Sequence, residues 1–125
     1  MKEIVSTSKA PSAIGPYSQG VKVGNMLFIS GQIPLDPVTG NIVEGDIKEQ
    51  TKRVLENLKG IIESVGANLS NVVKTTVFMV DLSEFSQMND IYKEYFAENS
   101  PARTTVQVSG LPRSAKIEIE AIVIL

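Results

Sequence analysis

The 125-residue sequence predicts an α+β fold in which a mixed sheet of about six strands carries two amphipathic helices on one face. Segments that alternate every second residue and are rich in β-branched residues occur in both halves of the chain. Two segments with apolar residues at helical spacing lie between them. The length, with 42% hydrophobic and 21% charged residues, fits one globular domain over residues 1–125.

The N-terminal part of the chain predicts three strands. The segment Lys2–Ser6 has strand composition, and a loop over residues 10–18, stiffened by two prolines and a glycine, follows it. Two further strands, 21–23 and 26–30, flank Gly24-Asn25, which are the residue types that a tight hairpin turn requires. These strands are expected to be neighbours in the sheet.

The first helix is predicted from Asp46 onward, after a turn at Asp36–Gly40. Apolar residues recur at helical spacing from Ile47 to Val65. Asp46 is suited to cap the N-terminus, and Glu49 three residues later completes a pair resembling a capping box. Gly66 is a residue at which such a helix can stop.

The second half of the chain predicts strand, helix, strand, strand. Residues 72–80 alternate as a strand does, and Ser83 opens a second helix that ends at Asn99-Ser100-Pro101. Two more strands, 104–108 and 116–125, complete the element order β-β-β-α-β-α-β-β. This order mixes hairpins with a helical crossover and therefore predicts a mixed sheet.

The sheet is predicted to have apolar residues on both faces, although two helices cover only one. In the last strand Glu118, Glu120, Ile122 and Ile124 share one face, and Ile117, Ile119, Ala121 and Val123 share the other. In residues 72–80, Val73, Val77 and Met79 share one face, and Phe78 and Val80 the other. An apolar face without a helix predicts contact with another subunit. The alternative is a misplaced strand and a face partly exposed to solvent.

The composition excludes several classes of chemistry. The chain has no histidine and no cysteine, which removes imidazole acid/base catalysis, thiolate nucleophiles, disulfides and zinc-finger sites. A serine hydrolase is not expected, because there is no histidine to activate Ser30 and no Gly-x-Ser-x-Gly motif occurs. Any catalysis must use carboxylates, Arg, Lys, Tyr, hydroxyls, backbone groups or water.

The charge pattern and hydropathy bear on partners and compartment. The net charge of −2 comes from interspersed acids and bases with no run of Lys or Arg, so nucleic acid is not an expected partner. The N-terminus lacks an apolar signal segment, and no apolar run approaches the roughly 18 residues of a membrane helix. We expect a cytoplasmic protein without a membrane segment.

Four short motifs contain the side chains that could carry chemistry. Arg103 follows a proline at the start of a strand, where an oriented guanidinium could bind a carboxylate bidentately; a surface salt bridge is the commoner role. Glu118 lies between two isoleucines, so burial could raise its pKa; a solvated strand residue is commoner. Tyr17 in Gly-Pro-Tyr is more often a turn aromatic, and Ser30-Gly31 more often marks a strand end.

These motifs, in this order and spacing, resemble those of the RidA/YjgF/L-PSP family. The resemblance extends over the whole chain. It includes Ala13–Gln19, Ser30–Pro34, Val73–Phe78, Asp81-Leu82, Pro101–Arg103 and Lys116–Ala121.

The resemblance implies a chorismate-mutase-like α+β fold and a homotrimer with the sheets facing inward and three clefts at the subunit interfaces. In deaminase members of the family, an arginine at the position of Arg103 binds the substrate carboxylate, and a glutamate at the position of Glu118 holds the hydrolytic water. Both residues are present here.

The resemblance also implies further substrate-binding residues. They are Tyr17, Ser30, Gly31 and Asn89, with Tyr17 contributed by a neighbouring subunit. The chain departs from the family pattern after the arginine, where deaminases commonly have Ser-Cys and this sequence has Thr104-Thr105. A backbone role at this position would survive the change to Thr105, whereas a thiol-dependent role would not.

The function implied is hydrolysis of reactive 2-imino acids, such as 2-iminopropanoate and 2-iminobutanoate, to 2-oxo acids and ammonia. Because an imine is already electrophilic, orientation, charge neutralisation and an activated water would suffice, and no cofactor or metal is expected. The alternatives are an endoribonuclease or translation inhibitor of the L-PSP type, and a non-catalytic metabolite-binding trimer.

Overall fold

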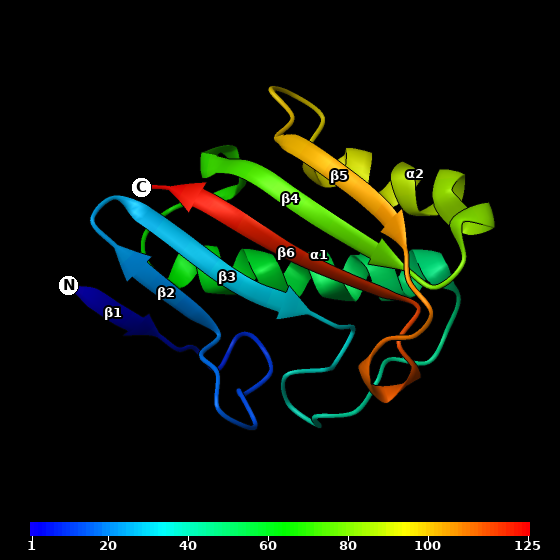
Figure 1. The fold of residues 1–125 in the computed structure, drawn as a ribbon, viewed down its shortest axis with the longest axis horizontal. Helices are drawn as coiled ribbons and strands as arrows, with labels where there is room; N and C mark the ends of the chain where they lie inside the picture. Colours follow the sequence, from blue (N-terminus) through cyan, green and yellow to red (C-terminus); the bar gives the residue numbers. More distant parts are fainter.

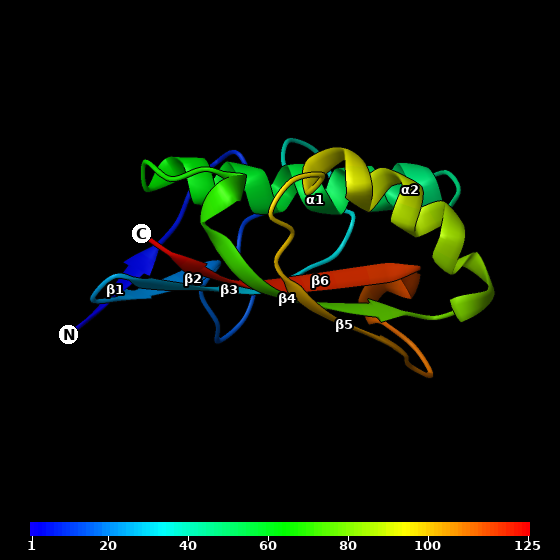
Figure 2. The ribbon, with the colours of Figure 1, turned by 90° about the horizontal axis from the view of Figure 1, so that it is seen from above.

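Both helices lie on the same face of a six-stranded sheet in the computed structural model, which describes residues 1–125 (Figures 1 and 2). The elements are β1 (Lys2–Val5), β2 (Gly20–Val23), β3 (Met26–Gln32), α1 (Ile47–Ser64), β4 (Val72–Met79), α2 (Phe85–Tyr95), β5 (Ala102–Gln107) and β6 (Ile117–Ile124). The strand order is β1-β2-β3-β6-β4-β5, and only β4 and β5 are parallel. The predicted α+β class, element order and mixed sheet are confirmed.

Local sequence signals account for the turn and helix ends that were predicted. Gly24 has φ +59°, and the β2–β3 hairpin pairs the residues on either side of Gly24-Asn25. The Asp46 carboxylate accepts a hydrogen bond of 3.0 Å from the Glu49 N–H. Gly66 follows α1 with φ +81° and donates its N–H to the Glu63 carbonyl. This left-handed glycine ends the helix, as expected.

The start of α2 differs from the prediction. Ser83 does not open the helix; it lies in a 3-10 turn, Leu82–Glu84, and α2 begins at Phe85. The Asp81 carboxylate accepts from the Ser83 N–H at 2.9 Å and caps this turn. An aspartate two residues before Ser83 therefore caps a short turn that precedes the helix.

The face assigned to Val73 was also wrong. The pairing of β4 with β6 shifts register between Val72 and Lys74, which is a β-bulge. Val72 is consequently buried at 4% exposure while Val73 is 45% exposed. Val77 and Met79, beyond the bulge, are buried as predicted. A single extra residue reverses the alternation on one side of the bulge, and periodicity alone does not reveal it.

The hydrophobic core lies between the sheet and the two helices (Figure 2). The alternate residues Ile117, Ile119, Ala121 and Val123 of β6 are buried against α1, as predicted.

The helices are joined by a hydrogen bond of 2.6 Å from the Tyr95 hydroxyl to Glu56. Burial and the Glu56 carboxylate raise the pKa of Tyr95 far above its usual range, so this hydroxyl stays a donor. Neither helix has the length and apolarity to span a membrane.

The opposite face of the sheet has no helix over it (Figure 2). Apolar side chains remain accessible there: Phe28 is 42% exposed, and Ile122 and Ile124 are half-buried. The prediction that both faces of the sheet carry apolar residues is confirmed. We refer to this side as the open face.

Candidate functional site

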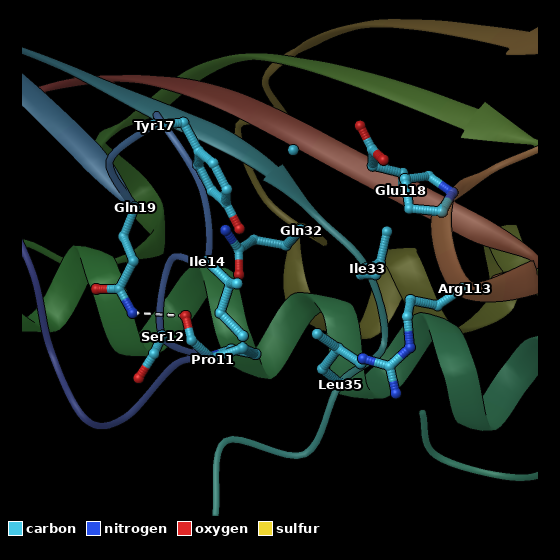
Figure 3. Close-up of a pocket in the computed structure, with 12 residues that line it drawn as sticks. Pro11, Ser12, Ile14, Tyr17, Gln19, Gln32, Ile33, Leu35, Arg113 and Glu118 are labelled. Atoms are coloured by element: carbon cyan, nitrogen blue, oxygen red, sulfur yellow. Dashed lines mark hydrogen bonds between the residues drawn. The ribbon is translucent and has the colours of Figure 1, made fainter. Parts of the chain in front are cut away.

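A hollow of about 430 Å³ lies where the loop before β2, the end of β3 and the start of β6 meet (Figure 3). Three of the predicted site residues line it: Tyr17, Gly31 and Glu118. They come from positions far apart in the sequence and meet because β3 and β6 are neighbouring strands. We call these three residues the Glu118 half-site.

Glu118 is half-buried and belongs to the open face, since its neighbours Ile117 and Ile119 are in the core. Burial raises the pKa of its carboxyl group, and the nearby Glu120 charge raises it further. No hydrogen bond to the carboxylate opposes this shift. A carboxylate with a raised pKa and free acceptor positions is suited to taking a proton from water.

Glycine is required at position 31 by the proximity of Glu118. A β-carbon added there would lie 2.7 Å from the carboxyl carbon of Glu118 and closer still to one of its oxygens. The pairing of β3 with β6 is irregular between Ile29 and Gln32, which leaves Ser30 and Gly31 outside the regular ladder. The irregular strand and the missing side chain together make room for the carboxylate.

Ser30 lies next to Gly31 at the irregular end of β3. It does not line the hollow; its hydroxyl donates to the Ser18 carbonyl at 2.6 Å, and its N–H donates to the Gln19 carbonyl at 3.0 Å. Both bonds tie the loop that carries Tyr17 to strand β3. Ser30 therefore holds a wall of the hollow in this structure.

Arg103 lies on β5 at the edge of the sheet, on the side of the helices. Its guanidinium carbon is 4.7 Å from the centroid of the Tyr92 ring and 5.3 Å from that of Phe85. Its Nη1 donates to Asn89 Oδ1 at 2.8 Å. Two aromatic contacts and one hydrogen bond orient the group and leave most of its N–H donors free.

Asn89 and Arg103 line a second hollow of about 410 Å³ between α2 and β5. Thr105 lies two residues further along β5, half-buried on the same side, opposite Val77. We call Asn89, Arg103 and Thr105 the Arg103 half-site. The structure thus brings together the predicted partners of Arg103 but not Arg103 and Glu118.

The two half-sites lie on opposite faces of the sheet. Arg103 is paired with Thr75, whose buried hydroxyl contacts Tyr92 of α2, whereas Glu118 is paired with Phe78. Strand β4 separates them, which places their Cα atoms roughly 14 Å apart from the usual strand spacing and rise. One chain therefore does not assemble the two charged groups around one ligand.

Two buried amide side chains hold the walls of the first hollow in place, and sequence reasoning missed their role. Gln19 accepts from the Thr7 N–H at 2.6 Å and donates to the Pro11 carbonyl at 2.7 Å. Asn57, fully buried on α1, donates to the carbonyls of Ile33 and Leu35 at 3.3 and 3.0 Å. The available signal for Asn57 was a polar residue among the apolar positions of the helix.

Arg113 also lines the first hollow and was not predicted. It belongs to a 3-10 turn, Pro112–Ser114, in which Arg113 has φ +59° and Ser114 φ +57°. No motif marked this position, because only the folded chain brings residue 113 to the loop between β3 and α1. No group of three or more carboxylate, His or Cys side chains that could hold a metal ion occurs.

Comparison with known proteins identifies relatives over nearly the whole chain. A family model described as endoribonuclease L-PSP matches residues 7–125. A RutC family protein of Pyrococcus abyssi is 60% identical over 97% of this chain and 95% of its own length. The human protein named 2-iminobutanoate/2-iminopropanoate deaminase is 48% identical over 99% of this chain and 90% of its own. The crystal structure of Escherichia coli TdcF with bound serine has a TM-score of 0.94, with 45% identity over 98% of each chain.

Proposed function

Because this chain belongs to the L-PSP family, which is also the RidA/YjgF family, we propose that it hydrolyses 2-imino acids to 2-oxo acids and ammonia. The observation that carries the proposal is the pair of half-sites with complementary chemistry. One offers an oriented guanidinium with free donors, and the other a carboxylate with a raised pKa. The name of the human relative and the serine bound to TdcF support a small amino-acid-like ligand.

In the proposed reaction, Arg103 binds the carboxylate of the imino acid through two charge-assisted hydrogen bonds. Glu118 accepts a proton from water while the water oxygen bonds to C2, and the π electrons of the C=N bond move to nitrogen. The nitrogen takes one proton to become an amino group and then a second, the C2–N bond breaks, and ammonia leaves. Loss of the hydroxyl proton gives the 2-oxo acid. No cofactor enters this sequence.

We propose that a homotrimer joins the two half-sites. The accessible apolar residues of the open face, including Phe28, support a subunit interface. In a closed ring with head-to-tail contacts, each subunit presents different surfaces to its two neighbours. The Glu118 half-site of one subunit would then meet the Arg103 half-site of the next. Tyr17 lines the same hollow as Glu118 and would be contributed to the shared site by the same subunit.

The first expected result concerns mass. Light scattering at micromolar concentration should give three times the 13.5 kDa mass of the chain, because the open face would otherwise leave apolar side chains in water. Dilution below the dissociation constant should abolish activity together with the trimer. A stable monomer that retains activity would contradict the shared site.

The test of the proposed function is ammonia release from enzymatically generated 2-iminopropanoate and 2-iminobutanoate. We expect the protein to raise the rate above the spontaneous hydrolysis of the imine, without added metal or cofactor. The control is the same mixture with heat-denatured protein. A rate equal to the spontaneous one would reject imine hydrolysis and leave a binding role.

The family description also names ribonuclease activity, which makes RNA cleavage the second candidate. The chain has 14 acidic and 12 basic residues and no histidine, so it offers neither a strong phosphate-binding charge nor imidazole catalysis. Incubation with single-stranded RNA under the conditions of the imine assay distinguishes the two activities. RNA cleavage that survives loss of Arg103 and Glu118 would point to another site.

A further inference from the structure

Arg113 is a cation that lines the same hollow as Glu118 and forms no ion pair with an acidic side chain. Its guanidinium makes one hydrogen bond, from Nη1 to the Gly40 carbonyl at 3.3 Å. The ion pair of the chain, Lys48 with Asp90, involves other residues. The charge of Arg113 is therefore available to an anionic ligand in the hollow that it lines.

The backbone holds Arg113 in an uncommon conformation. Arg113 and Ser114 both have φ near +60°, in the left-handed region that favours glycine. Pro112 precedes them, and the buried Ala115 closes the turn by donating its N–H to the Pro112 carbonyl at 3.1 Å. Strained residues of this kind persist where the surrounding structure holds them, often at ligand-binding positions.

The lining of the hollow is acidic at one end, apolar in the middle and basic at the other end (Figure 3). Glu118 and Arg113 lie apart, with the Ile33 side chain between them and Leu35 beside Arg113. Ile14 adds to the apolar wall. A matching ligand has a reactive end, an aliphatic middle and an anionic far end.

We propose that Arg113 binds a second carboxylate at the end of the substrate side chain. The preferred substrates are then the 2-imino acids of dicarboxylic amino acids, with a side chain of about the length of glutamate. This inference rests on the proposed function of the same site. Arg103 would bind the carboxylate next to the imine, and Arg113 would offset the repulsion between the second carboxylate and Glu118.

The test compares three imines produced in the assay by oxidases acting on L-glutamate, L-glutamine and L-alanine. Their hydrolysis is followed as kcat/KM for the wild-type protein and for Arg113→Gln. We expect the variant to lose about ten-fold on the glutamate-derived imine, because an exposed charge-assisted hydrogen bond is lost. The other two imines, which lack the second carboxylate, should change by less than about two-fold.

Two variants serve as controls. Arg113→Lys keeps the charge and should retain most of the activity on the glutamate-derived imine. Lys116→Gln removes an equal charge three residues away, outside the lining of this hollow, and should leave the ratio between the substrates unchanged. A change in all three imines alike would mean a structural role for Arg113 and would overturn the inference.

The outcomes separate this inference from the proposed function. Hydrolysis of the alanine-derived imine with an unchanged substrate ratio in Arg113→Gln overturns the inference alone. If no imine is hydrolysed, the proposed function fails, and calorimetric binding of 2-oxoglutarate and 2-oxobutanoate decides the role of Arg113. Tighter binding of 2-oxoglutarate that is lost in Arg113→Gln supports it, and equal binding of both acids overturns it.

Discussion

Replacement of Arg103 by alanine is expected to lower kcat/KM for imine hydrolysis by at least about 100-fold. The estimate assumes the loss of two charge-assisted hydrogen bonds, each worth about 1.5–3 kcal/mol. The fold should persist, because Arg103 is partly exposed on the edge strand β5 and its removal leaves no buried charge unpaired. Arg103→Lys should recover little activity, because an ammonium group reproduces neither the bidentate contact nor the stacking on Tyr92. Near-normal activity of the lysine variant would reject the bidentate role.

Mixed trimers test whether Arg103 and Glu118 act from different subunits. Subunits carrying Arg103→Ala are unfolded and refolded together with subunits carrying Glu118→Gln. If each site takes one residue from each of two neighbours, about one quarter of the sites in a random mixture regain both native residues. Recovery of activity well above either variant alone is expected. If both residues act within one chain, every mixed site keeps a defect, and activity does not recover.

Replacement of Glu118 by glutamine is expected to lower turnover by about ten-fold or more, while binding of a 2-oxo acid changes only a few-fold. Glutamine has nearly the same shape as glutamate and fits the space above Gly31, but it cannot accept the proton of the attacking water. Positioned acid/base groups contribute on the order of 100-fold or more, and the lability of the imine reduces this effect. Stopped assays of ammonia release and calorimetry measure the two quantities separately. Unchanged turnover would make Glu118 a scaffold residue.

The raised pKa of Glu118 adds a pH signature to this experiment. Wild-type activity should fall on acidification from a higher pH than an ordinary glutamate would give, since protonation removes the base. The acidic limb should be absent from the residual activity of Glu118→Gln. The effect of pH on stability has the opposite sign. Because burial favours the protonated carboxyl group, Glu118 stabilises the fold below its pKa in the unfolded chain, and this contribution is lost as the pH rises through its pKa in the folded protein. The glutamine variant should therefore be at least as stable as wild type at neutral pH.

The amino-acid sequence predicted the elements of the fold because their signals are local. The alternation of β6, the Gly24-Asn25 turn and the Asp46 cap depend on residues a few positions apart, and the structure contains all three. The start of α2 and the face of Val73 were wrong. In the first case Asp81 caps a 3-10 turn that precedes the helix, and in the second a bulge reversed the alternation.

The tertiary structure decided how the candidate residues are grouped. The motifs supplied Arg103 and Glu118, but their separation across β4 and on opposite faces follows from the strand order β6-β4-β5. Arg113 reaches the hollow only because the turn before β6 folds against the loop between β3 and α1, where its guanidinium donates to the Gly40 carbonyl. This contact joins residues 73 positions apart, and no local periodicity of the sequence indicates it. Sequence thus determined which side chains are available, and the folded sheet determined which of them can act on one ligand.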